Sequence, residues 1–367
     1  MKVCLVVYKY TSPLDDPTCY PLGFMYISSV LKNAGIKVKF LNYNLWDYDF
    51  KEEVKDQDVV MFTGFEMFKS SIVRDAKVCK ELGIRTILGG ALATFKPEEM
   101  VLHVDTVVIG EAENVVLESL KYKGSVLVGN SPDLERLPFP DYDGFGVEEY
   151  FRRNESRYIG ILTSRGCPFS CTFCVQTCSY QERNMESIFT EIDYYTDKYK
   201  VDTINFNDNT LNVKKSRFMS LCSGMKERNL VWGGAIRCDV FDDEMARAAS
   251  ESNCSVLIAG VESFNQEKLD RMNKQIKVQD IYKTLDLLHK YKISYYSNIL
   301  LGFENETYEE IAKEVCSIPS EYVIFPCLVL PFVGTKNGRV RLLDREQEQF
   351  LDTNFRNYVV ERGYRLT

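Results

Sequence analysis

The chain has 367 residues, 45% of them hydrophobic and 27% charged, and its formal net charge is −8. This length suggests two domains or one large α/β barrel, and the acidic balance disfavours nucleic-acid binding, because phosphates need a basic surface. We expect a cytoplasmic protein without a membrane span, since no apolar run is long enough to cross a bilayer and the N-terminus lacks a signal-peptide cleavage site.

The first half alternates apolar runs with amphipathic ones. The pattern predicts strands at residues 2–8, 36–44, 58–64, 84–90 and 104–111 and helices at 21–35, 68–83 and 114–122. Strands separated by helices form parallel sheets, so residues 1–128 are expected to form a doubly wound, Rossmann- or flavodoxin-like domain. Ligands of such domains bind at the carboxyl ends of the strands. The residues that fall there are Thr63, Gly64, Phe65, Glu66, Gly89, Gly90, Leu92, Gly110 and Glu111.

A stretch rich in Pro, Gly and Asp follows, and we interpret residues 129–150 as a linker. A second α/β series then occupies residues 151–338. Its predicted strands are 158–164, 201–207, 230–236, 255–260, 293–302 and 322–330, and its predicted helices are 185–200, 216–229, 243–253, 278–292 and 308–318. Six β/α units are fewer than the eight of a full barrel, so the sequence predicts a partial (β/α)6 TIM-like barrel with a short tail at 339–367.

Cysteine and histidine are used unevenly, with twelve cysteines and two histidines in the chain. Many cysteines in a long chain of this kind indicate metal ligands or core residues rather than a disulfide framework. Since only His103 and His289 are available, a zinc or haem site built on histidine is not expected, nor is a Ser-His or Cys-His catalytic pair.

Four cysteines gather in TSRGCPFSCTFCVQTC, residues 163–178, directly after the first strand of the second half. A βα loop at the carboxyl end of a barrel strand is the expected place for chemistry, and several thiolates can hold a soft metal centre. Structural zinc on Cys167, Cys171, Cys174 and Cys178 is disfavoured, because zinc knuckles usually pair CxxC units from two loops. Buried, unligated cysteines are a further alternative. The third interpretation is a [4Fe–4S] cluster on Cys167, Cys171 and Cys174, which leaves one iron open.

The CxxxCxxC spacing resembles that of the radical S-adenosylmethionine (SAM) enzymes. The resemblance implies that the open iron binds the amino and carboxylate groups of SAM, and that one electron cleaves SAM to methionine and a 5′-deoxyadenosyl radical. Phe173, just before the third cysteine, would lie near the adenine. Cys178 is one cysteine more than the family needs, and we interpret it as a bystander.

Further turns resemble the SAM site of this family, in order and in register with the predicted strands. They are NFNDNTLN, GAIRCD, AGVESFNQEKLDRMNK, LLGFENET and LPFVGTKNG. Asn209, Phe303 and Asn305 depart from the family pattern. The resemblance implies SAM contacts at Asp208, Arg237, Glu262, Ser263 and Gly302.

The first half resembles the cobalamin-binding domain that precedes the radical domain in one large subgroup. The matching stretches are PLGFMYISSVLKNAGIKVKFLNYN, GGALATFKPEEM and VDTVVIGEAENVVLESL. The resemblance implies cobalamin contacts at Gly23, Thr63, Gly64, Phe65, Glu66, Gly89, Gly90, Leu92, Gly110 and Glu111. Leu92 replaces the usual histidine of GGxH, and the DxHxxG motif is absent, so the lower face of the cobalt would lack a histidine ligand.

Two other interpretations of the first half remain open. The domain could have lost cobalamin, or bind only substrate. It could carry a second cluster, as in methylthio-transferring relatives, but Cys4, Cys19 and Cys79 fall in a strand, a loop and a helix, which disfavours that arrangement.

The combined resemblance implies an oxygen-sensitive, cobalamin-dependent radical SAM enzyme that methylates an unactivated carbon, with flavodoxin or ferredoxin as electron donor. One alternative is a rearrangement, oxidation or epimerisation, in which Cys238 or Cys327 donates a hydrogen atom or contacts the substrate. Another is a non-enzymatic iron–sulfur or cobalamin redox sensor. Fewer than 40 residues follow Thr335, which favours an open site and a large substrate such as a peptide or lipid, or a lid supplied by a partner.

Overall fold

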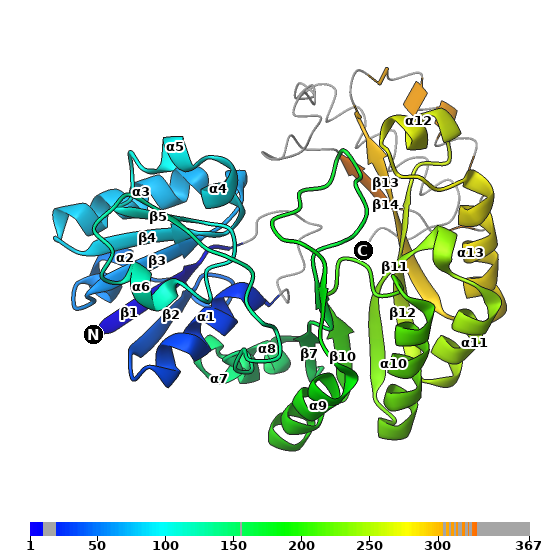
Figure 1. Cartoon of the computed structure of the whole chain (residues 1–367), viewed down its shortest axis with the longest axis horizontal. Helices are drawn as coiled ribbons and strands as arrows, with labels where there is room; N and C mark the ends of the chain where they lie inside the picture. The colour runs from blue at the N-terminus through cyan, green and yellow to red at the C-terminus, as the bar shows by residue number, and fades with distance from the viewer. Residues whose placement is uncertain are drawn as a thin grey trace. The chain divides into compact units, whose positions relative to one another are not determined.

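The computed structural model of the chain (Figure 1) describes residues 1–9, 20–154 and 156–303, a few positions between 306 and 322, and the backbone of 325–328. The predicted tail at 339–367, Cys19, Asn305 and the LPFVGTKNG turn lie outside the described residues. The chain divides into two compact units. The first consists of residues 1–168, 176–211 and 224–232, and the second of 169–175, 212–223 and 233–367.

The first half folds around a six-stranded parallel sheet with the order β2-β1-β3-β4-β5-β6. Its strands are β1 (Lys2–Val7), β2 (Lys37–Asn42), β3 (Val59–Thr63), β4 (Arg85–Gly89), β5 (Thr106–Ile109) and β6 (Val126–Val128). The order 2-1-3-4-5 is that of flavodoxin-like domains, so the predicted doubly wound fold is confirmed. β6 was not predicted, because its three residues are too short a run to produce a periodic signal.

Helices cover both faces of this sheet (Figure 1). They are α1 (Leu22–Asn33), α2 (Phe50–Val54), the 3₁₀ turn η1 (Glu66–Phe68), α3 (Lys69–Glu81), α4 (Gly90–Phe95), α5 (Pro97–Met100) and α6 (Val116–Ser119). α1 packs against α6, and α2 packs against α3. Strands of a sheet covered on both faces are apolar throughout, and accordingly Val60, Phe62 and Leu88 are fully buried.

The stretch interpreted as a linker contains α7 (Tyr142–Phe145) and the start of α8 (Val147–Asn154), which continues beyond residue 150. Tyr142 is buried against Tyr20 and Tyr195. Its hydroxyl donates to the carbonyl of Gly160 and accepts from the amide of that residue, at 2.6 and 2.9 Å. The segment is therefore a packed part of the first unit that fastens the start of the second sheet.

The second sheet has six strands in the order β14-β13-β12-β11-β10-β7. They are β7 (Tyr158–Ile161), β10 (Thr203–Phe206), β11 (Val231–Arg237), β12 (Cys254–Glu262), β13 (Ser294–Leu301) and β14 (Phe325–Leu328). The helices between them are α9 (Met185–Tyr199), α10 (Lys215–Arg228), α11 (Asp243–Glu251), α12 (Gln266–Arg271) and α13 (Val278–Lys290). Each predicted strand corresponds to one of these six, which confirms the partial barrel. The helix predicted at 308–318 falls only partly within the described residues.

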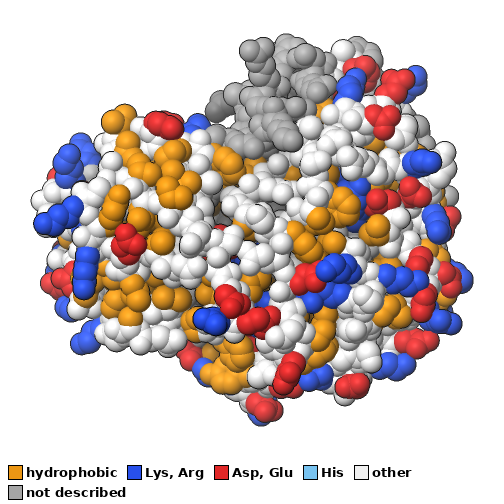
Figure 2. Space-filling model, viewed as in Figure 1, with side chains coloured by type: hydrophobic (Ala, Val, Ile, Leu, Met, Phe, Trp, Pro, Cys, Tyr) orange, Lys and Arg blue, Asp and Glu red, His pale blue; other side chains and the backbone are white. Residues whose placement is uncertain are grey.

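Charged side chains of both signs are intermingled on the face drawn in Figure 2. Several form exposed ion pairs, such as Lys215 with Asp242 and Lys290 with Asp243, each at 2.5 Å. Among the described residues, none of the helices is long and apolar enough to cross a membrane.

Candidate cofactor sites

The cysteine loop, residues 166–180, is closed at its base by a two-stranded antiparallel ribbon of β8 (Ser164–Arg165) and β9 (Gln181–Glu182). Gly166 lies directly after β8, with a φ of 69°. A Cβ at this position would lie 2.6 Å from the carbonyl oxygen of Ser179. The two ends of the loop therefore approach each other so closely that only glycine fits at residue 166.

We predict that Gly166→Ala destabilises the first unit more than Gly83→Ala does. Gly83 has a similar φ of 71°, but a Cβ there meets no atom within 4 Å. Both variants take on the left-handed backbone cost of about 1–2 kcal/mol, whereas only Gly166→Ala adds a clash, of roughly 1–3 kcal/mol. Urea unfolding of the two variants measures the difference, and equal losses would show that the loop base is not tightly closed.

The cysteines of the loop differ in their surroundings. Cys167, Cys171 and Cys178 are half-buried, whereas Cys174 is exposed. The Cys167 thiol lies 3.7 Å from Thr210 Oγ1, and the Cys174 amide donates to the carbonyl of Cys171 at 3.3 Å. In the part of the chain that the structure describes, no three Cys, His, Asp or Glu side chains converge on one metal position, so the ligand set still rests on the spacing in the sequence.

In the second unit, Arg237 holds the middle of the cysteine loop. The guanidinium carbon lies 3.8 Å from the centroid of the Phe169 ring, and Nε pairs with Asp239 at 2.7 Å. Its own backbone is fixed by Asn212, whose amide side chain exchanges hydrogen bonds with the N–H and C=O of Arg237 at 2.8 and 2.9 Å. Burial raises the pKa of Cys171, while the positive charges of Lys274 and Arg237 oppose the increase.

Glu262 ends β12 and pairs with Lys274 at 2.8 Å, with both side chains largely buried. Its φ of 65° is unusual for a residue other than glycine, and such strained residues cluster at functional sites. The Lys274 ammonium also lies 5.7 Å from the centroid of the Phe173 ring. The structure thus brings together the predicted residues Glu262, Phe173 and Arg237, and Lys274 is a member of this group that the sequence analysis missed.

Ser263 and Gly302 are tied to a buried charged network. Lys268 is 1% exposed and forms ion pairs with Glu306 at 2.7 Å and with Glu314 at 3.0 Å. Glu314 also accepts hydrogen bonds from the Ser263 hydroxyl and, at 2.8 Å, from the Phe264 amide. Glu306 accepts from the Gly302 amide at 3.0 Å. This network fixes the turns that follow β12 and β13.

Asp208 follows β10 in the first unit and is almost completely buried. Its carboxylate accepts hydrogen bonds from the Thr163 amide at 2.7 Å, from the Thr163 hydroxyl at 2.6 Å and from the Ser164 hydroxyl at 2.5 Å. The structure therefore places this predicted SAM contact against the strand that leads into the cysteine loop.

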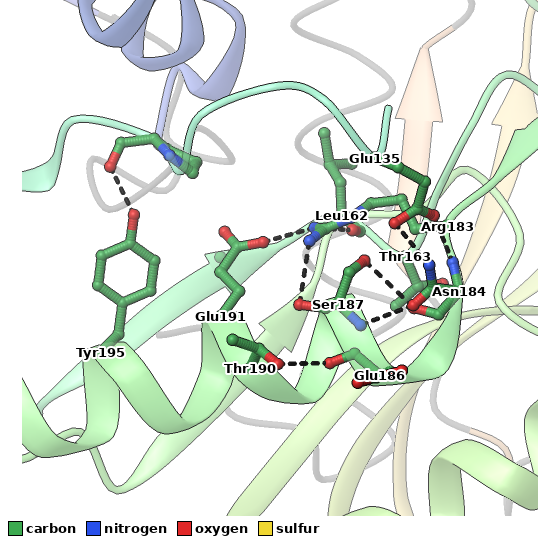
Figure 3. A network of polar contacts seen from close by, with 12 residues as sticks. Glu135, Leu162, Thr163, Arg183, Asn184, Glu186, Ser187, Thr190, Glu191 and Tyr195 are labelled. Carbon is green, nitrogen blue, oxygen red and sulfur yellow. Dashed lines mark hydrogen bonds and ion pairs between the residues drawn. The ribbon is translucent and has the colours of Figure 1, made fainter. Parts of the chain in front are cut away.

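The chain that leaves the loop is held by Arg183 (Figure 3). This residue pairs with Glu191 of α9 at 2.5 Å and donates to the Leu162 carbonyl at 2.9 Å. The Asn184 side chain caps α9 by accepting a hydrogen bond from the Ser187 amide at 2.7 Å. The backbone N–H of Asn184 in turn donates to the Glu135 carboxylate at 2.6 Å. Both ends of the cysteine loop are thus fixed within the first unit.

The two cysteines predicted as hydrogen donors lie in different settings. Cys238 is buried beside the carbonyl of Gly260, at 3.8 Å, and burial raises the pKa of its thiol to about 12. Cys327 is paired with Leu300 through the backbones of β14 and β13, but its side chain lies outside the described residues.

Because a raised pKa leaves almost no thiolate, we predict that iodoacetamide at pH 8 alkylates Cys174 in iron-free protein and spares Cys238. Burial raises the pKa of Cys4, Cys79 and Cys222 to about 12 as well, and these thiols serve as internal references. Peptide mass spectrometry measures the modification, with denatured protein as the control. Labelling of Cys238 as fast as Cys174 would contradict its burial.

A cavity of about 310 Å³ lies in the first unit. Its lining includes Gly23 of α1 and the carboxyl ends of β3, β4 and β5, which are the ends that the doubly wound fold presents to ligands. The base of the cysteine loop completes the lining with Ser164, Arg165, Gly166, Thr177 and Cys178, together with Asn207 and Asn209 after β10.

Six of the residues predicted to contact cobalamin line this cavity, namely Gly23, Thr63, Gly89, Gly90, Gly110 and Glu111. The other four do not. Leu92 is buried in the core of the first sheet, and its amide donates a hydrogen bond to the Gly64 carbonyl. Phe65 is exposed, and Glu66 forms an ion pair with Lys96 at 2.8 Å. Cys178, interpreted as a bystander, is part of the lining.

Arg165 forms a buried ion pair with two carboxylates at the cavity wall. Its Nη1 lies 2.8 Å from Glu111 and 2.7 Å from Glu113, and its guanidinium carbon lies 5.0 Å from the centroid of the Tyr26 ring. Burial alone would lower the pKa of Arg165, but the two carboxylates outweigh it and raise the pKa. Neither Arg165 nor Glu113 was predicted from the sequence. Arg165 lies 54 positions after Glu111 and 52 after Glu113, and no local motif connects residues that far apart.

Two family models match the chain in succession. The B12 binding domain matches residues 16–120, and the radical SAM superfamily matches residues 161–315. The chain is a radical SAM enzyme with an N-terminal B12-binding domain. Both resemblances found in the sequence are thereby confirmed.

Known proteins are similar to this radical SAM enzyme along most of its length. An uncharacterized methyltransferase of Pyrococcus horikoshii is 25% identical, over 92% of this chain and 82% of its own. Bacteriochlorophyllide d C-12(1)-methyltransferase of Chlorobaculum tepidum is also 25% identical, over 86% and 72%. The structure of the radical SAM methyltransferase TsrM from Kitasatospora setae superposes with a TM-score of 0.72 at 17% identity, covering 92% of this chain and 75% of that one.

The residues present suit a corrinoid in the cavity and an iron–sulfur cluster on the cysteine loop. A Cβ built on Gly23 or Gly89 meets no atom within 4 Å, so the bare backbone leaves open space in the cavity for a large ring. A volume near the lower end of the ~300–1,000 Å³ of ordinary ligand pockets holds only part of a cobalamin molecule. The thiols of Cys167, Cys171 and Cys174 are the soft ligands that iron–sulfur clusters require.

Proposed function

We propose that the chain is a cobalamin-dependent radical SAM methyltransferase that methylates an unactivated carbon of its substrate. The cavity of the first unit carries this proposal, because its wall combines glycines of the B12-binding domain with the base of the cysteine loop. Two relatives named as methyltransferases, similar over most of the chain, support the reaction type.

In this proposal Cys167, Cys171 and Cys174 hold a [4Fe–4S] cluster and leave one iron for SAM. When bound, the cofactors supply an electron that cleaves SAM to methionine and a 5′-deoxyadenosyl radical, and a carrier for the methyl group. Arg237 keeps the loop in place through Phe169, whose ring it covers. Flavodoxin or ferredoxin in the cytoplasm would provide the electron.

Glu262, Ser263 and Gly302 are proposed to bind the polar parts of SAM, and Phe173 its adenine. The Glu262–Lys274 pair fixes the carboxylate that would face the ligand, and the Lys268 network holds the two neighbouring turns. Groups positioned before the ligand arrives lose little freedom on binding, which favours a single productive geometry. Asp208 would act indirectly, by fixing Thr163 and Ser164.

On the cobalamin side, Gly23, Gly89, Gly90 and Gly110 are proposed to let the backbone approach the corrin ring. Gly90 has a φ of 81°, and a Cβ there would lie 2.4 Å from Thr63 Oγ1, so a side chain cannot be accommodated at this position. Leu92 lies in the core and is not part of the cavity lining, so it would not contact a corrinoid bound there.

The proposal is tested by the two products that SAM leaves behind. Reduced, iron-reconstituted protein is incubated with SAM, with or without hydroxocobalamin, and the nucleosides are quantified by mass spectrometry. The radical step releases 5′-deoxyadenosine, whereas donation of the methyl group releases S-adenosylhomocysteine. We expect 5′-deoxyadenosine in both samples and S-adenosylhomocysteine only with cobalamin. Formation of 5′-deoxyadenosine alone in both samples would leave a radical enzyme that does not transfer methyl groups.

A further inference from the structure

Arg165 links two loops that lie far apart in the sequence. It is the last residue of β8, at the closed base of the cysteine loop and two residues before Cys167. Glu111 and Glu113 belong to the loop after β5 of the first sheet. The side chains of Arg165, Glu111 and Glu113 are only 11%, 9% and 5% exposed, so a charged contact largely shielded from water joins the two loops.

The contact is also part of the cavity wall. Arg165, Glu111 and Glu113 all line it, and so do Gly166 and Cys178, which lie at the two ends of the cysteine loop. Glu111 Oε1 accepts from Arg165, while its buried Oε2 has no hydrogen-bond partner among the described residues. Two carboxylates therefore share one guanidinium, and neither can move away from it without leaving a buried charge unpaired.

We propose that Arg165 is a positioning residue that couples occupancy of the cavity by a corrinoid to the conformation of the cysteine loop. This inference rests on the proposed function, because it takes the cavity as the corrinoid site. A corrinoid that packs against the loop after β5 restrains Glu111 and Glu113, and through them Arg165 and the base of the cysteine loop. Coupling between two sites is reciprocal, so the anchored loop in turn strengthens corrinoid binding.

The experiment compares variants of the reconstituted protein in two measurements. One is the dissociation constant for hydroxocobalamin, and the other is hydrogen–deuterium exchange of peptides that cover residues 166–180. In the wild type, hydroxocobalamin should slow exchange in these peptides. In Arg165→Met this protection should be lost, and the dissociation constant should rise by roughly 5–150-fold, the usual range for coupled sites.

Further variants separate coupling from loss of folding. Arg165→Lys keeps a cation near both carboxylates and should recover part of the protection. The variant R165M/E111Q/E113Q removes every charge of the contact, so it avoids a buried unpaired carboxylate and remains informative if Arg165→Met does not fold. It should bind as weakly as Arg165→Met. The matched control R74Q/D75N removes an ion pair of α3, with Asp75 buried, that belongs neither to the cavity lining nor to the cysteine loop, and its dissociation constant should stay within about twofold of wild type, as for independent sites.

Two outcomes are distinguished. If the wild type does not bind hydroxocobalamin, the proposed function fails. If the wild type binds it, but the charge-free variant keeps both the affinity and the loop protection, the proposed function stands and the coupling through Arg165 is refuted.

Discussion

Replacing Cys171 with serine is expected to abolish the iron–sulfur cluster and, with it, the cleavage of SAM. A cluster with one open iron depends on three thiolates, and the Cys171 thiol lies in the part of the loop that Arg237 holds through Phe169. Loss of one ligand should therefore remove the charge-transfer absorbance and bring 5′-deoxyadenosine to the level of a reaction without protein.

Cys178→Ser provides the matched control for this loss. Cys178 belongs to the same loop and is half-buried like Cys171, but it is not one of the three proposed ligands. Its iron content should equal that of the wild type. If instead Cys178→Ser loses iron while Cys171→Ser keeps it, the ligand set is wrong and the open iron must be reassigned.

Replacing Lys268 with methionine is expected to cause a large loss in the free energy of unfolding. Substitution by methionine leaves Glu306 and Glu314 buried without their cation, and breaking a buried ion pair in this way costs about 3–5 kcal/mol. The free energy of unfolding, from urea titrations, measures the loss. The neutral variant K268M/E306Q/E314Q should recover much of it, because no charge is left unpaired; failure to recover would show that the loss comes from packing.

The loss at Lys268 should also depend on pH. Burial already raises the pKa of Glu306, and Lys268 opposes the increase. Without Lys268 the folded-state pKa rises further above the unfolded value, so the folded state binds more protons than the unfolded one between these two values. Stability of Lys268→Met should therefore fall as pH rises through that window, and the variant should lose more at pH 8 than at pH 5. An equal loss at both values would contradict this account.

The sequence pattern was sufficient for the main elements. Residues 22–33 form α1 as predicted, because apolar side chains recur at helical spacing before a glycine that ends the helix. All six barrel strands were recognised because each is an apolar run between helices and turn residues. α8 was missed, because the Pro and Gly residues before it suggested a linker. Its buried Val147, Tyr150 and Phe151 fall at helical spacing, and this signal could have revealed it.

The candidate sites were predictable only where a motif is local. The three cysteines and the Glu262–Ser263 turn stand out by their spacing, whereas the partners that hold them come from distant positions. Lys268 meets Glu306 and Glu314 across 38 and 46 residues, and Arg165 meets Glu111 across 54. No periodicity connects such residues, so only the folded chain brings them together. Leu92 shows the converse, because a motif position suggested a ligand contact but packing placed it in the core.

The joint binding of a cobalamin and an iron–sulfur cluster is tested most simply by the absorption spectrum of anaerobically purified, iron-reconstituted protein after incubation with hydroxocobalamin and desalting. Corrin bands should be retained beside the iron–sulfur charge-transfer shoulder, because one chain holds both cofactors. A shoulder without corrin bands would contradict the cobalamin-dependent reaction and would reduce the cavity of the first unit to a site for substrate or for another partner.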